Sequence, residues 1–329
     1  MATLEVRDLH LSIGGVPILR GVSFDLEPGQ TLGIVGESGC GKSMTAFSVM
    51  GMLPNKGKIT QGSIKLEGRE LVGLSDKQYS QVRGREVALI MQDPFTSLNP
   101  MMRVGAQIVE SLKLHRGLSG QEAWKEAVKL LDHVGIPAPE SSARKFPHQM
   151  SGGQRQRVVI AMAFSSRPKV LIADEPTTAL DVTLQAQILR LLKQLQEEHG
   201  CAVMMISHDI GAIAAVSHRV AVFYAGRIVE VGPAEKVLRH GAMPYTRALL
   251  NALPRPGRTD LETISGQPPM LGNLPKGCSF GPRCPFKTEA CDVEPELKLV
   301  GPDRLAACWH GEKVAALEEG ALIRSATLS

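Results

Sequence analysis

Eight consecutive residues near the amino terminus have the types and spacing that bind phosphate. They fit the pattern G-x-x-x-x-G-K-[ST] at every defined position. The residues are Gly36, Glu37, Ser38, Gly39, Cys40, Gly41, Lys42 and Ser43. Glycines let backbone N–H groups approach phosphate oxygens, and the start of a following helix adds partial positive charge. We predict that this segment, the phosphate loop, binds a nucleoside triphosphate together with Met44, which follows it.

Three side chains of the phosphate loop have different predicted roles. Lys42 should hold the β- and γ-phosphates, and Ser43 should bind a Mg²⁺ ion. Cys40 stands at an unspecified position of the pattern, so we interpret it as a small space-filling residue rather than a redox group.

Two acidic residues follow a second apolar run. The run from Val170 to Ala173 ends in Asp174, Glu175 and Pro176. A strand that delivers two acids to its carboxyl end can place one on Mg²⁺ and the other beside an attacking water. Acids after a strand are usually just a solvated loop, but the phosphate loop in the same chain favours catalysis. We predict Asp174 as a metal ligand and Glu175 as the catalytic residue that activates water.

The segment Met150-Ser151-Gly152-Gly153-Gln154 resembles the signature L-S-G-G-Q of ABC ATPases, with Met in place of Leu. In that family the segment covers the ATP that is bound by the opposite subunit. The start of the helix that follows the segment binds the phosphate of that ATP, as helix starts bind anions in general. The resemblance implies that Ser151, Gly152, Gly153 and Gln154 bind the γ-phosphate of a partner's ATP. Hydrolysis would then require a dimer.

Three further motifs of the ABC family stand in the expected order. Gln92 resembles the Q-loop residue that senses Mg²⁺ and communicates with a membrane subunit; Ala179-Leu180-Asp181 resembles the D-loop; and His208 resembles the catalytic switch histidine. One feature departs from the family: the stretch from Leu11 to Gly14 has no aromatic residue to stack on adenine. ATP is the predicted nucleotide, with Ile13 packing on its base, and discrimination against GTP stays open.

Two other segments resemble a narrower group, the ATP-binding subunits of oligopeptide, dipeptide and nickel importers. They are Gln92 to Pro100, followed by Arg103-Val104-Gly105, and Pro244 to Leu250, where Met243 replaces the usual His. The resemblance implies an ATP hydrolase that energises peptide import, with nickel, glutathione or another small solute as alternatives. A non-transport ABC ATPase acting on ribosomes or DNA is disfavoured because such proteins usually carry two cassettes or a coiled-coil insertion.

The same resemblance implies partners. We expect two transmembrane permease subunits, a second ATP-binding subunit that is a paralogue rather than an identical copy, and indirectly an external solute-binding protein. The chain would lie on the cytoplasmic face of the inner membrane as a peripheral subunit. The resemblance also implies that the membrane subunits and the binding protein select the transported solute.

The elements that must position these residues alternate between strand and helix patterns. Residues 4–35 alternate apolar and polar positions around turns at Gly14-Gly15 and Pro28-Gly29, which predicts antiparallel strands leading to a buried strand at 32–35. Residues 95–150 have helical patterns at Gln107–Leu114 and Gln121–Val134, separated at 115–117. An amphipathic helix ending at Gly200 separates two apolar runs, Val170–Ala173 and Cys201–Ile206, which predicts a parallel sheet.

These patterns predict an α/β fold with a parallel-sheet core, an antiparallel β subdomain and a helical insertion at about 95–150, and the resemblance implies that it is a P-loop NTPase cassette of the ABC type. We predict a nucleotide-binding domain over 1–253 and a small cysteine-rich extension over 254–329, because Pro254-Arg255-Pro256-Gly257 has linker composition.

Four cysteines lie in this extension, at Cys278, Cys284, Cys291 and Cys308. A reducing cytoplasm disfavours disulfides, and four thiolates suit either a [4Fe–4S] cluster or Zn²⁺. Tight C-x2–4-C pairs typical of zinc are absent, which favours the cluster, and the extension of peptide importers is associated with such clusters. Zinc and free thiols stay open as alternatives.

Composition limits the remaining classes. The 329 residues carry a net charge of +4 without a polybasic run, and only 4% are aromatic, so we expect no nucleic-acid partner. The amino terminus lacks the pattern of a secretory signal, and no stretch reaches the roughly 20 apolar residues that span a bilayer. A cytoplasmic location is expected.

Overall fold

The computed structural model describes residues 2–178, 180–252 and 264–317. The chain divides into two compact units, each made of segments that are far apart in the sequence. The first unit comprises residues 1–4, 25–31 and 65–206, and the second comprises residues 5–24, 32–64 and 207–329. The predicted boundary at 253/254 and the linker 254–257 lie outside the described residues.

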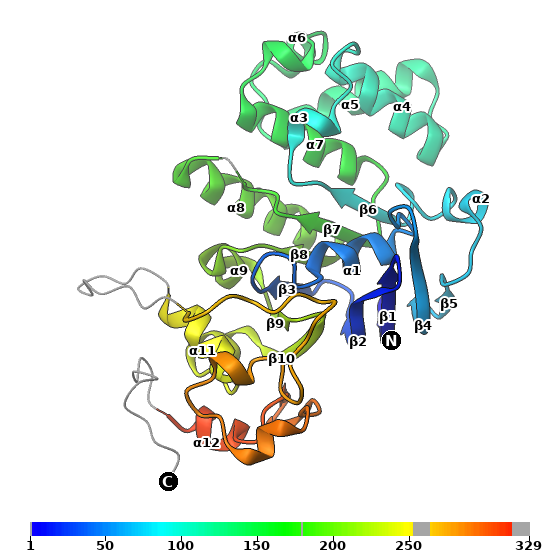
Figure 1. The fold of residues 1–329 in the computed structure, drawn as a ribbon. Helices are drawn as coiled ribbons and strands as arrows, with labels where there is room; N and C mark the ends of the chain where they lie inside the picture. The colour runs from blue at the N-terminus through cyan, green and yellow to red at the C-terminus, as the bar shows by residue number, and fades with distance from the viewer. Residues whose placement is uncertain (1, 179, 253–263, 318–329) are drawn as a thin grey trace. The chain divides into compact units, whose positions relative to one another are not determined.

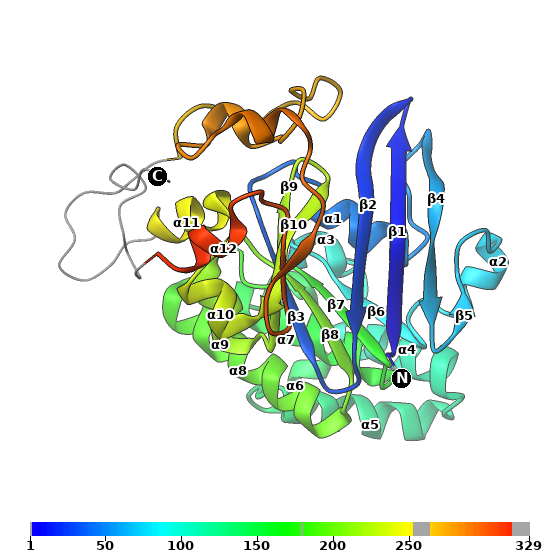
Figure 2. The same ribbon diagram turned by 90° about the horizontal axis from the view of Figure 1, so that it is seen from below.

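Long strands near the amino terminus form one sheet of the second unit. β1 (Leu4–Ile13), β2 (Val16–Leu26) and β4 (Gly57–Leu66) lie side by side in the order β2-β1-β4 (Figure 2). The glycines at 14 and 15, both with positive φ, form the two-residue turn between β1 and β2. The last two residues of β4, Lys65 and Leu66, belong to the first unit and pair there antiparallel with the short β5 (Arg69–Glu70). The predicted strands at 4–35 are therefore present.

A second set of strands in the second unit supports the phosphate loop. β3 (Thr31–Val35) is buried throughout and pairs in parallel with β9 (Arg219–Tyr224), Leu32 facing Arg219. β10 (Arg227–Pro233), β12 (Arg304–Ala306) and β11 (Lys298–Gly301) continue the sheet by antiparallel pairing. The helices are α1 (Lys42–Val49), α9 (Ile210–Val216), α10 (Ala234–Arg239), α11 (Pro244–Asn251) and α12 (Gly311–Ala315). The predicted buried strand before the phosphate loop is confirmed.

The first unit contains the predicted parallel sheet. β6 (Val87–Ile90), β7 (Val170–Asp174) and β8 (Ala202–Ile206) pair in parallel in the order β8-β7-β6. The connection from β7 to β8 contains α8 (Val182–His199), which buries Ile188, Leu191, Leu192 and Leu195. It ends at Gly200, whose φ of 64° permits the left-handed cap.

Helices between β6 and β7 form a group in the first unit (Figure 1). They are α3 (Pro94–Ser97), α4 (Val104–Arg116), α5 (Gly120–His133), α6 (Pro139–Ala143) and α7 (Gly152–Ser165), while α2 (Asp76–Tyr79) precedes β6. The predicted break at 115–117 is too early, because α4 continues through Arg116 and ends at Gly117. Within the described residues, no helix is both long and apolar enough to cross a bilayer.

Candidate functional site

The phosphate loop leads from β3 into α1 in the second unit, as predicted. Gly36 has a φ of 153°, and a Cβ there would collide with the carbonyl oxygen of Phe223. Gly41, the N-cap of α1, has a φ of 106°, and a Cβ there would lie 2.8 Å from Leu19. Both positions therefore require glycine. No side chain caps α1, so its first N–H groups stay available to an anion.

The Lys42 side chain reaches back across the phosphate loop, where it is predicted to bind the β- and γ-phosphates. Its Nζ donates to the carbonyl oxygens of Gly36, at 2.8 Å, and Glu37, at 3.0 Å. The side chain is buried at the first position of α1. Cys40 is also buried, and this burial raises the pKa of its thiol, although the nearby Lys42 ammonium opposes the shift. A protonated buried thiol agrees with a space-filling role.

Sequence reasoning missed two residues that hold Glu37 of the phosphate loop. The backbone N–H of Glu37 donates to the Tyr245 hydroxyl at 2.8 Å. Arg283 forms a bidentate ion pair with the Glu37 carboxylate, with N–O distances of 2.7 and 2.9 Å. Both partners lie more than 200 residues away from Glu37 in the sequence, so no local pattern could reveal them.

Aromatic rings connect these two contacts. Tyr224, Tyr245 and Phe280 form a cluster with centroid separations of 4.5 to 5.4 Å, and the Arg283 guanidinium lies near the rings of Tyr224 and Phe280. Phe280 lies between the first two cysteines of the extension. The extension therefore packs directly behind the phosphate loop within the second unit.

The predicted carboxylates lie at the carboxyl end of β7 in the first unit. Asp174 is the last residue of β7 and is buried, and Glu175 follows with a φ of 52°, which is unusual for a non-glycine residue. The Glu175 carboxylate accepts hydrogen bonds from Thr178 Oγ1 at 2.7 Å and Gln92 Nε2 at 3.4 Å. The structure thus brings together two residues that were predicted separately, Gln92 and Glu175.

The predicted trans signature begins α7 in the first unit. Ser151 is the N-cap: its hydroxyl accepts from the Gln154 N–H at 3.3 Å, and the Gln154 side chain accepts from the Ser151 N–H at 3.1 Å. This is a capping box. A Cβ at Gly152 would meet nothing within 4 Å, whereas one at Gly153 would collide with Leu184. The backbone at Gly152 is therefore open to an approaching group.

The remaining motif residues occupy helix or strand ends. Asp181 is the N-cap of α8, accepting from the Leu184 N–H at 2.9 Å, and Ala179 of the same motif lies outside the described residues. His208 is exposed in the turn between β8 and α9. It belongs to the second unit, as the phosphate loop does.

The predicted Mg²⁺ ligands have suitable chemistry. Ser43, Gln92 and Asp174 offer hydroxyl, amide and carboxylate oxygens, the donors that hard cations prefer. The buried Asp174 carboxylate also fits, because a buried acid is stabilised by a bound cation. Each residue therefore has the donor chemistry that the predicted Mg²⁺ ion would need, and the ion would neutralise phosphate charge.

All six cysteines are free thiols. In the extension, burial raises the pKa of Cys284 to about 12, with repulsion from Cys308, Cys278 and Cys291 adding to the shift. Burial likewise raises the pKa of Cys308 to about 11. Cys278 and Cys291 lie side by side, because the Cys278 N–H donates to the Cys291 carbonyl oxygen at 2.8 Å. Among the described residues, however, no group of three or more His, Cys, Asp or Glu is arranged to hold a metal, so the present geometry fits neither the predicted cluster nor zinc.

Two family descriptions match the sequence. Residues 19–178 match "ABC transporter", and residues 229–291 match "Oligopeptide/dipeptide transporter, C-terminal region". The first match contains the phosphate loop, Gln92, the trans signature and Asp174-Glu175. The second contains Tyr245, Arg283 and three of the four clustered cysteines.

Curated relatives cover most of the chain. The oligopeptide transport ATP-binding protein OppD of Salmonella typhimurium is 49% identical over 312 residues, covering 93% of each chain. The dipeptide transport ATP-binding protein DppD of Bacillus subtilis is 46% identical over 314 residues, covering 93% of this chain and 94% of that protein.

Solved structures share the cassette fold. A dimeric ATP-binding cassette in a post-hydrolysis state with ADP and Pi matches with a TM-score of 0.63 and 27% identity, covering 70% of this chain and 98% of that one. Clostridium perfringens cbiO1, part of an ABC transporter complex, matches with a TM-score of 0.64 and 28% identity, covering 72% of this chain and 90% of that one.

Proposed function

This chain belongs to the ABC transporter family, among the oligopeptide and dipeptide transport ATP-binding proteins, and we propose that it hydrolyses ATP to drive peptide import across the cytoplasmic membrane. The observation that carries the proposal is the phosphate loop, held open by Gly36 and Gly41 at the uncapped start of α1. Lys42 already occupies the loop and needs only to exchange carbonyl oxygens for phosphate oxygens.

The other motif residues would supply the chemistry. Glu175 orients or deprotonates the attacking water, and Gln92, which donates to the same carboxylate, responds to loss of the γ-phosphate. Asp174 and Ser43 hold Mg²⁺, and His208 contacts the γ-phosphate. These roles are supported by residue type, by position at strand ends and by the Gln92–Glu175 contact.

Dimerisation would complete each site. The open backbone at Gly152 and the helix start at Ser151 and Gln154 suit a γ-phosphate bound to an opposing subunit. We propose a paralogous ATP-binding subunit as the partner, two transmembrane permease subunits with an external solute-binding protein, and a peripheral position on the cytoplasmic face of the inner membrane. Membrane permeases are the partners that an importer ATPase requires.

The test measures ATP hydrolysis by the purified complex of this chain with its partner subunits and uptake of labelled peptides by its host cell. Lys42→Ala should abolish both, and Lys193→Ala, which alters an exposed lysine on α8, should change neither. Labelled nickel and glutathione serve as competing substrates. Uptake of either one, without peptide, that depends on Lys42 would contradict peptide import, and Lys42-independent hydrolysis would contradict the ATPase assignment.

For the four clustered cysteines we keep the prediction of a [4Fe–4S] cluster, with zinc and free thiols as alternatives. Its support is the number and spacing of the four cysteines, together with the 2.8 Å backbone hydrogen bond from Cys278 N–H to the Cys291 carbonyl oxygen. Metal analysis after anaerobic purification decides among them: about four iron atoms per chain, lost in Cys278→Ser/Cys284→Ser, supports the cluster. Zinc or no metal contradicts it.

A further inference from the structure

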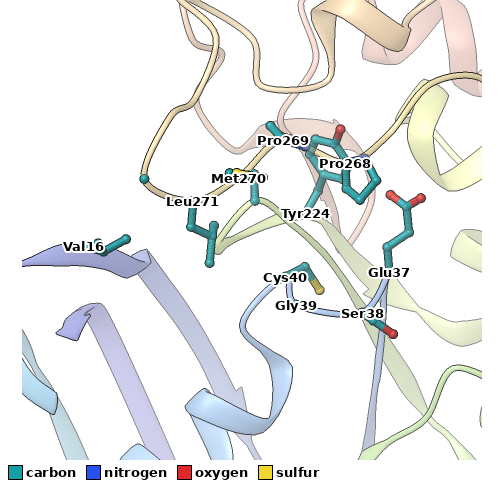
Figure 3. Close-up of a pocket in the computed structure, with 12 residues that line it drawn as sticks. Val16, Glu37, Ser38, Gly39, Cys40, Tyr224, Pro268, Pro269, Met270 and Leu271 are labelled. Atoms are coloured by element: carbon teal, nitrogen blue, oxygen red, sulfur yellow. The ribbon is translucent and has the colours of Figure 1, made fainter. Parts of the chain in front are cut away.

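A cavity of about 350 Å³ opens over the phosphate loop within the second unit (Figure 3). Residues 37–40 of the loop form one side, and residues 268–272 of the carboxyl-terminal extension form another. Val16, at the start of β2, and Tyr224, at the end of β9, complete the lining. This volume lies at the lower end of the range of ligand pockets.

The segment 268–272, which we name the apolar wall, carries almost no polar side-chain atoms. Its residues are Pro268, Pro269, Met270, Leu271 and Gly272. Figure 3 shows Leu271 between Val16 and the phosphate loop at Cys40. Met270 is 81% exposed. Leu271 is half-buried, and the exposed Met270 beside a phosphate site indicates a surface that a ligand covers.

Contacts fix the apolar wall near both of its ends, through Arg283 at Ser265 and through Val16 at Gly272. Arg283, whose side chain is 5% exposed, donates to the carbonyl oxygen of Ser265 at 2.9 Å and clamps Glu37 of the phosphate loop. A Cβ on Gly272 would lie 3.5 Å from Val16, so the far end of the wall lies against the first hairpin. A turn closed by the Asn273 N–H and the Met270 carbonyl, at 2.8 Å, shapes the segment between them.

The phosphate loop fixes which part of a ligand would enter this cavity. A nucleotide with its phosphates on residues 36–43 must place its sugar and base beyond the loop. The hairpin stretch Leu11 to Gly14 offers no aromatic ring for the base, and Ile13, which the sequence predicted to pack on the base, is not among the residues that line the cavity. The apolar wall and Val16 offer instead two apolar surfaces that can contact the faces of a flat ring by dispersion.

We propose that the apolar wall of the carboxyl-terminal extension is the base-binding surface of the nucleotide site, where the purine lies between residues 268–271 and Val16. The proposal rests on the proposed ATP-binding function and adds its specificity determinant. Because the wall recognises the base through apolar contact rather than hydrogen bonds, adenine and guanine nucleotides bind with affinities within about tenfold of each other.

The test titrates the full chain with ADP, GDP and inorganic pyrophosphate in the presence of Mg²⁺, by calorimetry. In Met270→Ser/Leu271→Ser, affinity for ADP and GDP falls about tenfold, because two apolar contacts are lost, while pyrophosphate affinity stays within about twofold. The matched control is Met101→Ser/Leu114→Ser, which removes one Met and one Leu from the exposed surface of the first unit and leaves all three affinities unchanged. Thermal unfolding verifies that both variants fold.

Unchanged ADP and GDP affinity in Met270→Ser/Leu271→Ser overturns the proposal. So does an equal loss for pyrophosphate, because the effect would then pass through the phosphate loop. A preference between ADP and GDP above about 100-fold would indicate hydrogen-bond reading of the base and also contradicts it. A wild-type chain that binds none of the three ligands contradicts the proposed function itself. When the wild-type chain binds them and Lys42→Ala weakens all three, the phosphate site is present, and an unchanged affinity in Met270→Ser/Leu271→Ser then overturns only the base-binding proposal.

Discussion

Two helix starts in this chain are predicted to bind the same kind of phosphate, yet they are built differently. α1 begins at Gly41 without any side-chain cap, in a loop whose glycine conformations keep its N–H groups accessible. α7 begins at Ser151 with a complete capping box, so one of its first N–H groups is already satisfied by its own side chain. The first start is open to a ligand, while the second is stable without one.

The difference suits a chain that contributes to two nucleotide sites, with α1 at the site of its own nucleotide and α7 at the site of its partner's nucleotide. An uncapped start leaves donors unsatisfied until phosphate binds, which favours ligand binding. A capped start must exchange the bond from Gln154 N–H to Ser151 Oγ when a partner's nucleotide arrives. We therefore expect α1 to govern nucleotide affinity and α7 to govern turnover in the dimer.

The largest effect should come from Lys42→Ala beside α1. Loss of the only loop ammonium should reduce ATP hydrolysis by about 10³-fold, because a positioned donor to developing phosphate charge is removed. Phosphate release and calorimetric nucleotide binding measure the effect, with Lys193→Ala as the exposed-lysine control. Wild-type affinity in Lys42→Ala would break the claim that α1 governs binding.

Glu175→Gln leaves both helix starts intact and removes only the predicted base. Hydrolysis should fall by about 10²-fold while ATP affinity stays within about twofold of wild type, because the amide oxygen still accepts from Thr178. Single-turnover assays and equilibrium binding on the same preparation separate the two quantities. Equal losses of binding and turnover would show that Glu175 acts through the fold instead.

Ser151→Ala tests the capped start directly. The variant should lose about 1 kcal/mol of unfolding free energy through the missing cap and about tenfold in ATP hydrolysis. Ser119→Ala is the matched control, because Ser119 and Glu122 form the same capping box on the equally long α5.

The two serine variants should be compared by urea unfolding and by hydrolysis. Ser119→Ala should lose a similar amount of stability, about 1 kcal/mol, and keep wild-type hydrolysis. If both variants lose hydrolysis equally, the role of Ser151 is to stabilise its helix and not to bind a partner's nucleotide.

Gly152→Ala should give the smallest effect and the most specific one. The methyl group meets nothing within 4 Å in this chain, so the unfolding free energy should rise by about 0.4–1 kcal/mol. Hydrolysis should nevertheless fall about fivefold, because the added methyl displaces the partner's phosphate from the backbone. A variant that is both more stable and fully active would remove Gly152 from the site.

Local patterns predicted a large part of the fold. The strands β3, β7 and β8 appeared as apolar runs of the right length, and α4 and α8 each end just before a glycine. The predicted break after α4 began two residues too early. His115 and Arg116 still belong to α4, and the Arg116 side chain forms an ion pair with Glu126 on α5 at 2.8 Å. The helix ends only where Gly117 adopts a left-handed φ.

The sequence by itself determined the phosphate loop, the capped start of α7 and the acids that end β7. Each depends on residues a few positions apart, where backbone sterics and local hydrogen bonds act without help from the rest of the chain. Their chemical roles could be predicted from spacing for the same reason.

Only the tertiary structure decided what surrounds the phosphate loop. The Arg283–Glu37 ion pair, the Tyr245 contact and the apolar wall join residues separated by more than 200 positions. Such contacts form because β3, β9 and β10 bring distant segments into one sheet. Charged and polar groups that are buried there are stable only when they pair with one another. No spacing within one sequence encodes that choice, so the extension could be predicted as a cysteine-rich segment but not as a wall of the nucleotide site.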